Sequence, residues 1–75
     1  MWVYDSPVGK MIIKYDSKEN RYALIINGES LGNYNSAIAA ANNVYMHVTG
    51  YYEWDILDGQ VDVPHDIYEW EKITG

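Results

Sequence analysis

The sequence contains no cysteine and no phenylalanine among its 75 residues, and it has only two prolines. Without cysteine, neither a disulfide nor a thiolate metal site can hold the chain together, which fits a reducing compartment. No apolar run approaches the roughly 20 residues of a membrane helix, and the N-terminus opens on Trp2-Val3-Tyr4 rather than on a signal segment. We therefore expect one small cytoplasmic domain, spanning residues 1–75, with no membrane association.

Positive charge is scarce, above all towards the C-terminus. Five lysines and arginines stand against eleven acids, which gives a net charge of −6. Up to residue 49 four acids balance four bases, whereas the remaining residues contain seven acids and Lys72 as the single base. The whole net charge therefore lies in the last third of the chain, which repels nucleic acid and attracts a basic partner.

The aromatic residues are eight tyrosines and three tryptophans, so every ring carries a polar atom. Such rings need a hydrogen-bond partner or water when they are buried, and they are common at protein interfaces. We expect most of them at the rim of the core, with the polar atom at the surface, and some in contact with a partner.

Two segments near the N-terminus alternate between two sets of residues, as half-buried strands do. In the first, Met11, Ile13 and Tyr15 alternate with Lys10, Ile12 and Lys14; in the second, Tyr22, Leu24 and Ile26 alternate with Arg21, Ala23 and Ile25. Ser6-Pro7-Val8-Gly9 predicts a type I turn after a first strand, and Asn27-Gly28 predicts a hairpin with positive φ at both positions. With a short fourth strand over residues 29–32, these segments predict an antiparallel meander.

One main helix is expected over residues 36–49, because the strand period changes to the helix period at Asn35. Asn35 or Ser36 can accept a hydrogen bond from the first-turn amides and so cap the helix. The apolar positions that share one helix face are Ala37, Ala41, Val44 and Val48. The strand residues that we expect to be buried against them are Met11, Ile13, Leu24 and Ile26. Gly50 is expected to be the left-handed residue that ends the helix.

The part of the chain that follows the main helix has weaker signals. Tyr52, Trp54 and Ile56 alternate with their neighbours, which predicts a short strand or an extended arm. Pro64 suits the first position of a short helix over residues 65–72. The predicted fold class is α+β, with an antiparallel three- to four-stranded β-meander followed by one main helix and a short C-terminal helix.

The turn, cap and anchor residues form a pattern that extends over nearly the whole chain. Its elements are Trp2-x-Tyr4-x-Ser6-Pro7-x-Gly9, Leu31-Gly32-x-Tyr34-x-Ser36, Thr49-Gly50, Trp54-Asp55 and Pro64-x-x-Ile67-x-x-Trp70. The pattern resembles a family of small bacterial proteins, which implies a bacterial origin and a shared fold but no activity. More weakly, the strands and helix resemble the sheet-plus-helix module of plant-type transcription factor and integrase DNA-binding domains. Those modules read DNA with an arginine-rich sheet face, which here holds only Lys10, Lys14 and Arg21.

No residue pattern commits the chain to an enzymatic reaction, and we expect no catalytic residue, cofactor or small-molecule ligand. His47 and His65, with Asp62 and Asp66 near the second, could in principle hold a metal ion. They lack the paired spacing of known sites, so we expect exposed histidines and no metal. Ser6 belongs to a turn and not to the strand-to-helix elbow that a nucleophilic serine needs.

The candidate partner-binding surface is the sheet face opposite the helix. We expect it to expose Ile12 and Ile25 between Lys10, Lys14 and Arg21, and a small domain seldom leaves such a patch unused. The acidic arm could cover this face, and its candidate contacts are Trp54 and Trp70, as anchors, and Tyr52. An arm folded onto its own sheet would hide the basic surface, and one placed on a neighbour's sheet would make a symmetric dimer. An arm that lies elsewhere would leave the face free for a partner.

By elimination, we expect a protein-interaction or regulatory module without catalysis, whose partner is another protein or a second copy of the chain. The alternative is a nucleic-acid-binding module that uses the basic sheet residues Lys10, Lys14 and Arg21. The acidic net charge counts against this alternative.

Overall fold

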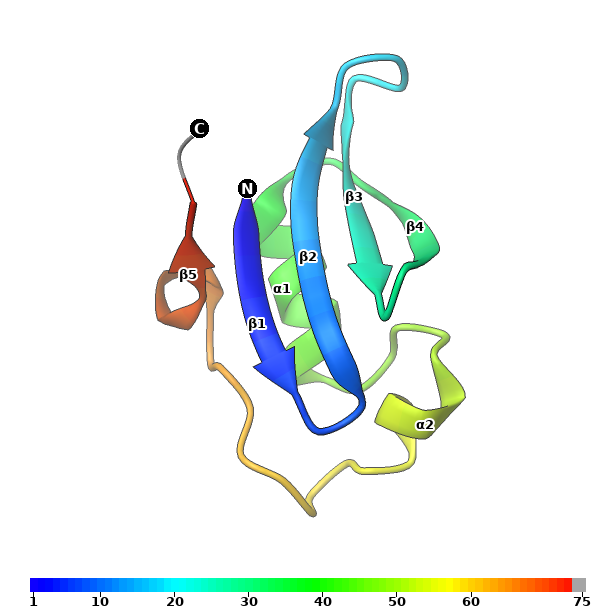
Figure 1. Ribbon diagram of the computed structural model, residues 1–75, viewed down its shortest axis with the longest axis vertical. Helices are drawn as coiled ribbons and strands as arrows, with labels where there is room; N and C mark the ends of the chain where they lie inside the picture. Colours follow the sequence, from blue (N-terminus) through cyan, green and yellow to red (C-terminus); the bar gives the residue numbers. More distant parts are fainter. Residues whose placement is uncertain (74–75) are drawn as a thin grey trace.

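The computed structural model describes residues 1–73, which form an antiparallel sheet with one main helix on one of its faces (Figure 1). The strands are β1 (Trp2–Ser6), β2 (Gly9–Asp16), β3 (Arg21–Ile26), β4 (Glu29–Tyr34) and β5 (Glu71–Lys72). The helical segments are α1 (Ala37–Tyr45), α2 (Tyr52–Asp55) and the 3₁₀ turn η1 (Ile67–Glu69). This arrangement confirms the predicted α+β class and the meander of β1 to β4.

β5 is a strand that the sequence does not predict. It pairs antiparallel with β1, with Lys72 opposite Trp2, so the order across the sheet is β4-β3-β2-β1-β5. The N-terminal ammonium donates to the Ile73 carbonyl at 2.9 Å, and the Ile73 N–H donates to the Met1 carbonyl at 2.7 Å. The last described residues therefore pair with the first ones and extend the sheet by a fifth strand.

The tight turns form where the turn residues predict them. Asn27 and Gly28 connect β3 to β4 with φ values of 52° and 85°, which confirms the predicted hairpin. Between β1 and β2, Ser6 Oγ accepts a hydrogen bond from the Val8 N–H at 3.2 Å and donates to the Gly9 carbonyl at 2.6 Å. Gly9 has a φ of 125°, which residues with a Cβ rarely adopt. These two turns fix the pairing of β1 with β2 and of β3 with β4.

Cross-strand pairing divides the side chains of the meander between the two faces of the sheet. Met11 lies opposite Ile26, and Ile13 lies opposite Leu24. All four are fully buried on the face that α1 covers. The residues between them point to the other face, because successive side chains of a strand alternate. The predicted alternation of β2 and β3 is confirmed.

One cluster of buried apolar side chains fills the space between the sheet and the helical segments. Besides the four strand residues, it contains Ala37, Ala40, Ala41, Val44, Trp54, Ile67 and Trp70. Seven of the eight residues that we expected in the core are confirmed there. The exception is Val48, which is 54% exposed. Ala40, which lies on the same side of the helix as Ala37 and Val44, is fully buried although the sequence analysis did not include it.

α1 begins at a predicted cap. Ser36 Oγ accepts a hydrogen bond from the Ala39 N–H at 3.1 Å, which is the geometry of an N-cap. Ala40 and Ala41 follow one turn later and are almost completely buried. Because these side chains are small, the helix axis can lie close to the sheet.

α1 ends at Tyr45, so the predicted range 36–49 is too long. His47, with a φ of 56°, takes the left-handed position that we expected at Gly50. Its N–H donates to the Val44 carbonyl, and the Val48 N–H donates to the Asn43 carbonyl, both at 3.1 Å. This pair of bonds is the Schellman pattern of a helix C-terminus. The chain has therefore left the helix before Val48, which explains the exposure of that side chain.

The chain then folds into α2, so the strand or extended arm predicted around Trp54 is wrong. The Asp55 carboxylate accepts hydrogen bonds from the Thr49 N–H at 3.0 Å, the Thr49 hydroxyl at 2.8 Å and the Gly50 N–H at 2.8 Å. Thr49 Oγ1 in turn accepts from the Tyr51 N–H at 3.0 Å. These bonds bring Asp55 back over the preceding loop, which an extended chain cannot do.

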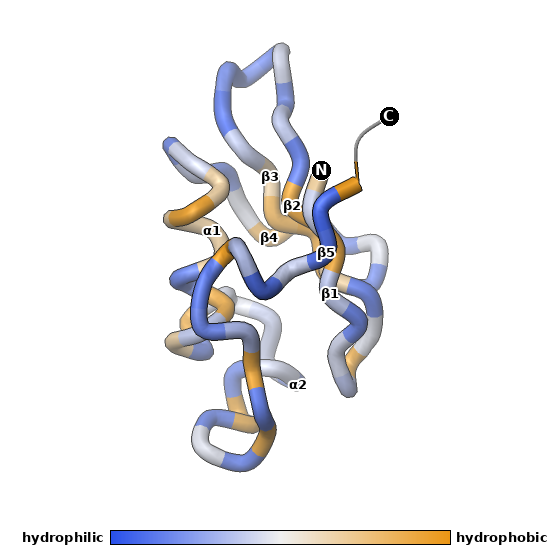
Figure 2. Tube along the Cα trace, turned by 90° about the vertical axis from the view of Figure 1, so that its left-hand side faces the viewer, coloured by the Kyte–Doolittle hydropathy of each residue, from blue (hydrophilic) through white to orange (hydrophobic). Residues whose placement is uncertain are grey.

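The short helix predicted over residues 65–72 is present only as η1. The Asp66 carboxylate caps this turn by accepting a hydrogen bond from the Tyr68 N–H at 2.9 Å. Trp70 follows with extended backbone and leads into β5. Residues 51–72, called the C-terminal arm below, pass beside α1 (Figure 2). No helix within residues 1–73 combines the length and the apolar character needed to cross a membrane.

Candidate functional site

The sheet face opposite α1, called the open face below, carries a row of apolar side chains. Val3 lies opposite Ile12 across β1 and β2, and Ile12 lies opposite Ile25 across β2 and β3. All three are half-buried by their neighbours in the sheet, and none belongs to the core cluster. Since α1 and the anchoring residues of the C-terminal arm pack on the other face, the row is left without an apolar cover from the described chain (Figure 2).

Charged side chains surround this row, and their signs balance. The face carries the three predicted bases Lys10, Lys14 and Arg21, together with the acids Asp5, Asp16 and Glu71. Lys10 lies opposite Asp5, and Arg21 lies opposite Asp16. The three bases are on the face that the strand alternation predicted. The three acids offset the three bases, so the expectation of a basic surface is wrong.

Two of the residues that could have covered the open face, Trp54 and Trp70, are buried on the opposite side of the sheet. Trp54 is 0% exposed, and its Nε1 donates to the Val44 carbonyl at 3.0 Å. Trp70 is 5% exposed, and its ring centroid lies 5.6 Å from that of Tyr4. Because α1 has only nine residues, it leaves part of its side of the sheet uncovered, and the two indole rings fill that space. Of the three arrangements left open by the sequence, the one observed is an arm that lies elsewhere and leaves the open face free, and Trp54 and Trp70 are core residues rather than partner contacts.

The remaining predicted contact of the arm, Tyr52, is exposed on α2. The structure therefore brings together one part of the predicted site and separates the other. The residues that share the open face are Ile12, Ile25, Lys10, Lys14 and Arg21; those outside it are Tyr52, Trp54 and Trp70.

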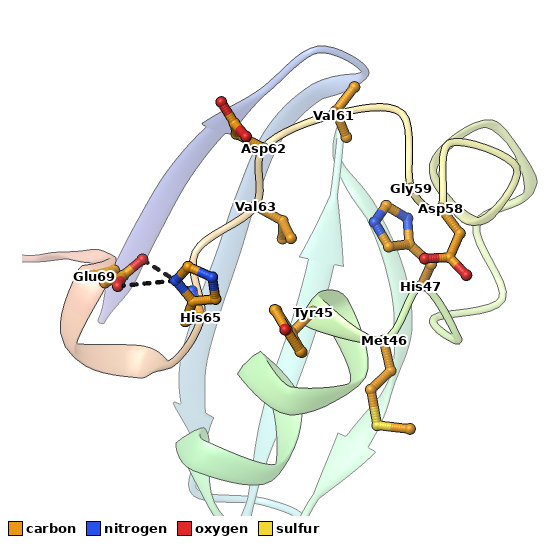
Figure 3. Close-up of a pocket in the computed structure, with 10 residues that line it drawn as sticks. All are labelled: Tyr45, Met46, His47, Asp58, Gly59, Val61, Asp62, Val63, His65 and Glu69. Atoms are coloured by element: carbon orange, nitrogen blue, oxygen red, sulfur yellow. Dashed lines mark hydrogen bonds and ion pairs between the residues drawn. The ribbon is translucent and has the colours of Figure 1, made fainter.

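A second candidate site is a pocket of about 640 Å³ between the end of α1 and the C-terminal arm (Figure 3). Its lining comes from the last turn of α1 and the residues after it, from the loop over residues 58–63, and from the segment around η1. Figure 3 shows that Tyr45 and Val63 face each other across the middle of this space. No pattern in the sequence predicts this pocket.

His47 is held in a fixed orientation at one wall of the pocket. The residue is 6% exposed, and its ring stacks on that of Trp54 with a centroid distance of 4.3 Å and an interplanar angle of 14°. His47 Nδ1 lies 2.8 Å from the Trp54 carbonyl oxygen, which can only accept, so Nδ1 carries a proton. The prediction of an exposed His47 is wrong, because the left-handed turn after α1 brings the ring back onto Trp54.

His65, on the opposite wall, is exposed as predicted and pairs with Glu69. Its Nδ1 lies 3.4 Å from Glu69 Oε2, and its backbone N–H donates to Glu69 Oε1 at 2.9 Å. The backbone hydrogen bond, assisted by the imidazole, lowers the pKa of the Glu69 carboxyl from its usual 4.5. Glu69 is therefore more readily ionised in the folded chain than in the unfolded one.

Tyr4 connects β1 to the loop of the pocket. Its hydroxyl donates to the Asp62 carbonyl at 3.2 Å, and its ring meets Trp54 edge-on at a centroid distance of 6.1 Å. Partial burial, followed by the negative charge of Asp62, raises the pKa of the Tyr4 hydroxyl from its usual 10.0. The hydroxyl therefore stays protonated and acts as a donor near neutral pH.

The polar groups of the pocket are mostly acceptors. His47 offers Nε2, and Asp58, Asp62 and Glu69 offer carboxylates. Within residues 1–73, no group of three or more histidine and acidic side chains is arranged to hold a metal ion. One sequence signal could have predicted the left-handed turn at His47. Histidine is among the residues enriched in the left-handed conformation, and His47 stands where the helix ends.

The chain matches no family model, no curated protein and no solved structure. The resemblance to a family of small bacterial proteins therefore stays a prediction.

Proposed function

We propose that the protein is an interaction module without catalysis, and that its open face binds another protein. The observation that carries this proposal is the row of Val3, Ile12 and Ile25, which lies in register across three strands and outside the core. Apolar side chains in such a row can bury area against a partner, while the charges around them fix its orientation. A cytoplasmic location, as expected from the lack of cysteine, fits this role.

A protein fits the open face better than a nucleic acid does. Asp5, Asp16 and Glu71 accompany the three bases there, and the whole chain carries a net charge of −6. Both features repel a phosphate backbone. A protein surface with both signs of charge can complement the face, and a second copy of this chain satisfies the same condition.

The test compares the wild type with the double variant Ile12→Thr/Ile25→Thr. Threonine is β-branched and keeps the strand propensity, but it reduces the apolar area of the row. The matched control is Ile38→Thr, because Ile38 is 58% exposed and lies on α1, outside the open face. Proteins captured from the native host are purified, and their affinities for the three chains are measured by calorimetry. Sedimentation velocity of each chain alone measures self-association.

We expect a partner, or a dimer, that the wild type and Ile38→Thr share and that the double variant loses. Equal affinity of all three chains for every purified partner contradicts the proposal. A chain that neither associates with itself nor retains a partner contradicts it as well. Wild-type binding to random DNA or RNA at low salt that Lys14→Gln weakens would favour the nucleic-acid alternative.

A further inference from the structure

The two ring nitrogens of His47 have different roles in the pocket. Nδ1 is occupied by the Trp54 carbonyl at 2.8 Å, so in the neutral ring the lone pair lies on Nε2. The ring is stacked on Trp54, and the residue is more than nine-tenths buried. The edge that carries Nε2 faces into the pocket (Figure 3). No hydrogen bond joins Nε2 to residues 1–73, and the atom is open to the pocket rather than fully buried, so it presents a fixed acceptor there.

The charged side chains of the lining determine which ligand fits this acceptor. Asp58, Asp62 and Glu69 line the pocket, whereas no lysine or arginine does. Besides His47, the only lining residue that can take up a positive charge is His65, and its imidazole already contacts Glu69. A ligand for this site must therefore supply hydrogen-bond donors and positive charge.

We infer that the pocket binds an organic primary ammonium ion, which donates one N–H to His47 Nε2. The negative charges of Asp58 and Asp62 attract the ammonium group. The carbon chain of the ligand packs against the apolar lining, formed by Val61, Val63 and the ring of Tyr45. The aromatic face of Tyr45 adds a favourable contact for a cation. This site lies on the helix side of the molecule and is separate from the open face.

An ammonium ion fits the site better than a metal ion. A metal ion needs several ligands in a defined geometry, and residues 1–73 contain no suitable group of three histidine or acidic side chains. An ammonium group carries its own donors and needs only one directed acceptor and nearby negative charge. The pocket lining supplies both, the acceptor from His47 and the negative charge from Asp58 and Asp62.

The same chemistry is found in a free amine and in the lysine side chain of a partner protein. We test both sources by titrating the ¹⁵N-labelled full chain with n-butylammonium chloride and with Nα-acetyl-lysine N-methylamide. Sodium butyrate at the same ionic strength is the control, because it has a similar carbon chain and the opposite charge. The readouts are the backbone amide signals and the imidazole nitrogens of His47.

We expect saturable shifts at Tyr45, His47, Asp58 and Val63 with an ammonium ligand and none with butyrate. The Nε2 signal of His47 should move more than the Nδ1 signal. Tighter binding of butylammonium would point to a free amine, and tighter binding of the lysine derivative would point to a protein side chain. Shifts that are linear in concentration, or equal with butyrate, overturn the inference.

Two variants and a matched control locate the interaction. His47→Asn keeps a residue that tolerates the left-handed conformation but removes Nε2, and we expect it to weaken binding by about tenfold, the effect of one charge-assisted hydrogen bond. Asp58→Asn should weaken binding, whereas Asp5→Asn, the same charge change on the open face, should not. If His47→Asn does not fold, the comparison of Asp58→Asn with Asp5→Asn still tests whether the ligand binds in the pocket. Equal weakening by Asp58→Asn and Asp5→Asn overturns the inference, because it would show a general charge effect.

Discussion

Trp54 joins the C-terminal arm to the rest of the molecule through contacts of its whole side chain. Its ring stacks on His47 and meets Tyr4 edge-on, and its Nε1 donates to the Val44 carbonyl at 3.0 Å. Replacing a fully buried tryptophan by alanine removes this packing and leaves a cavity. We expect Trp54→Ala to lower the free energy of unfolding by about 3–5 kcal/mol, measured by urea denaturation.

Trp70 is buried to a similar extent but lacks a polar partner. Its Nε1 is buried and has no hydrogen-bond acceptor among the described residues. Truncating Trp70 therefore removes an unsatisfied donor together with the packing, and the two effects oppose each other. Trp70→Ala should accordingly destabilise the fold less than Trp54→Ala does. Glu53→Gln, at an exposed position of α2, is the control and should leave the stability near that of the wild type. Equal stability of all three variants would contradict both expectations.

Glu69 couples the stability of the fold to pH. Its folded pKa lies below the usual 4.5, because the His65 backbone N–H and imidazole favour the charged carboxylate. A depressed folded pKa contributes stability above the unfolded pKa, and this contribution is lost as the pH falls through the folded pKa. Glu69→Gln keeps an acceptor for the backbone N–H but removes the charge.

Thermal melts at a series of pH values should therefore show a higher Tm for the wild type than for Glu69→Gln above pH 4.5. The difference in Tm should shrink as the pH is lowered further, because the wild-type carboxyl becomes protonated and is then uncharged like the glutamine amide. A difference that does not depend on pH would mean that the His65 contacts do not favour the charged form.

At the scale of elements, the contact between α1 and the sheet depends on small side chains. Ala41 is 1% exposed and lies in the cluster that includes Ile13 and Leu24. Leucine at this position would force the helix away from the sheet or into strained rotamers. We expect Ala41→Leu to lower the free energy of unfolding by about 1–3 kcal/mol. Asn42→Leu, at the next and exposed position of α1, should change it much less; a similar small change for Ala41→Leu would show that this helix face is not packed.

Elements whose signals are local could be predicted from the sequence. The Asn27-Gly28 turn, the Ser36 cap and the alternation of β2 and β3 depend on residues close together in the chain, and all three are confirmed. β5 forms because Lys72 pairs with Trp2 at the other end of the chain, and no local pattern reports such a pairing. α2 depends on the hydrogen bonds of Asp55 to residues before it, which its alternating sequence conceals.

The same distinction applies to the two candidate sites. The shared face of Ile12 and Ile25 could be predicted, because the two-residue period of a strand alone determines to which face a side chain points. Of the acids on that face, Glu71 arrives there through pairing of distant segments. Asp16 follows Lys14 in the alternation of β2, and Asp5 lies opposite Lys10 across the adjacent turn, so the same strand period could have placed both. The pocket forms because two separate segments, one with His47 and one with His65, lie on opposite sides of the same space. The left-handed turn that orients His47 contains no glycine, so the sequence gives no clear signal for it.

At the scale of the whole molecule, the charge is distributed as unevenly as in the sequence. The first 49 residues are neutral, and all of the net charge of −6 comes from the residues after them. These residues form α2, the loop of the pocket, η1 and β5, which run from below β3 and β4, around the lower end of the sheet, to the edge beside β1 (Figure 1). Within residues 1–73, the one salt-bridge contact of these acids joins Glu69 to the imidazole of His65, which is charged only when it is protonated. Repulsion among the remaining carboxylates therefore opposes the docking of the C-terminal arm.

Salt should relieve this repulsion and stabilise the fold. Exposed charges interact over a Debye length of about 8 Å at 0.15 M ionic strength, and a higher salt concentration shortens that range. We expect the Tm to rise with sodium chloride concentration. Asp58→Asn, within the acidic arm, should reduce the slope of this rise, whereas Asp5→Asn, in the neutral part of the chain, should leave it nearly unchanged. Both variants change the net charge equally, so equal slopes would show that total charge matters and the crowding of acids in the arm does not. A Tm that falls with salt would mean that attractive pairs outweigh the repulsion.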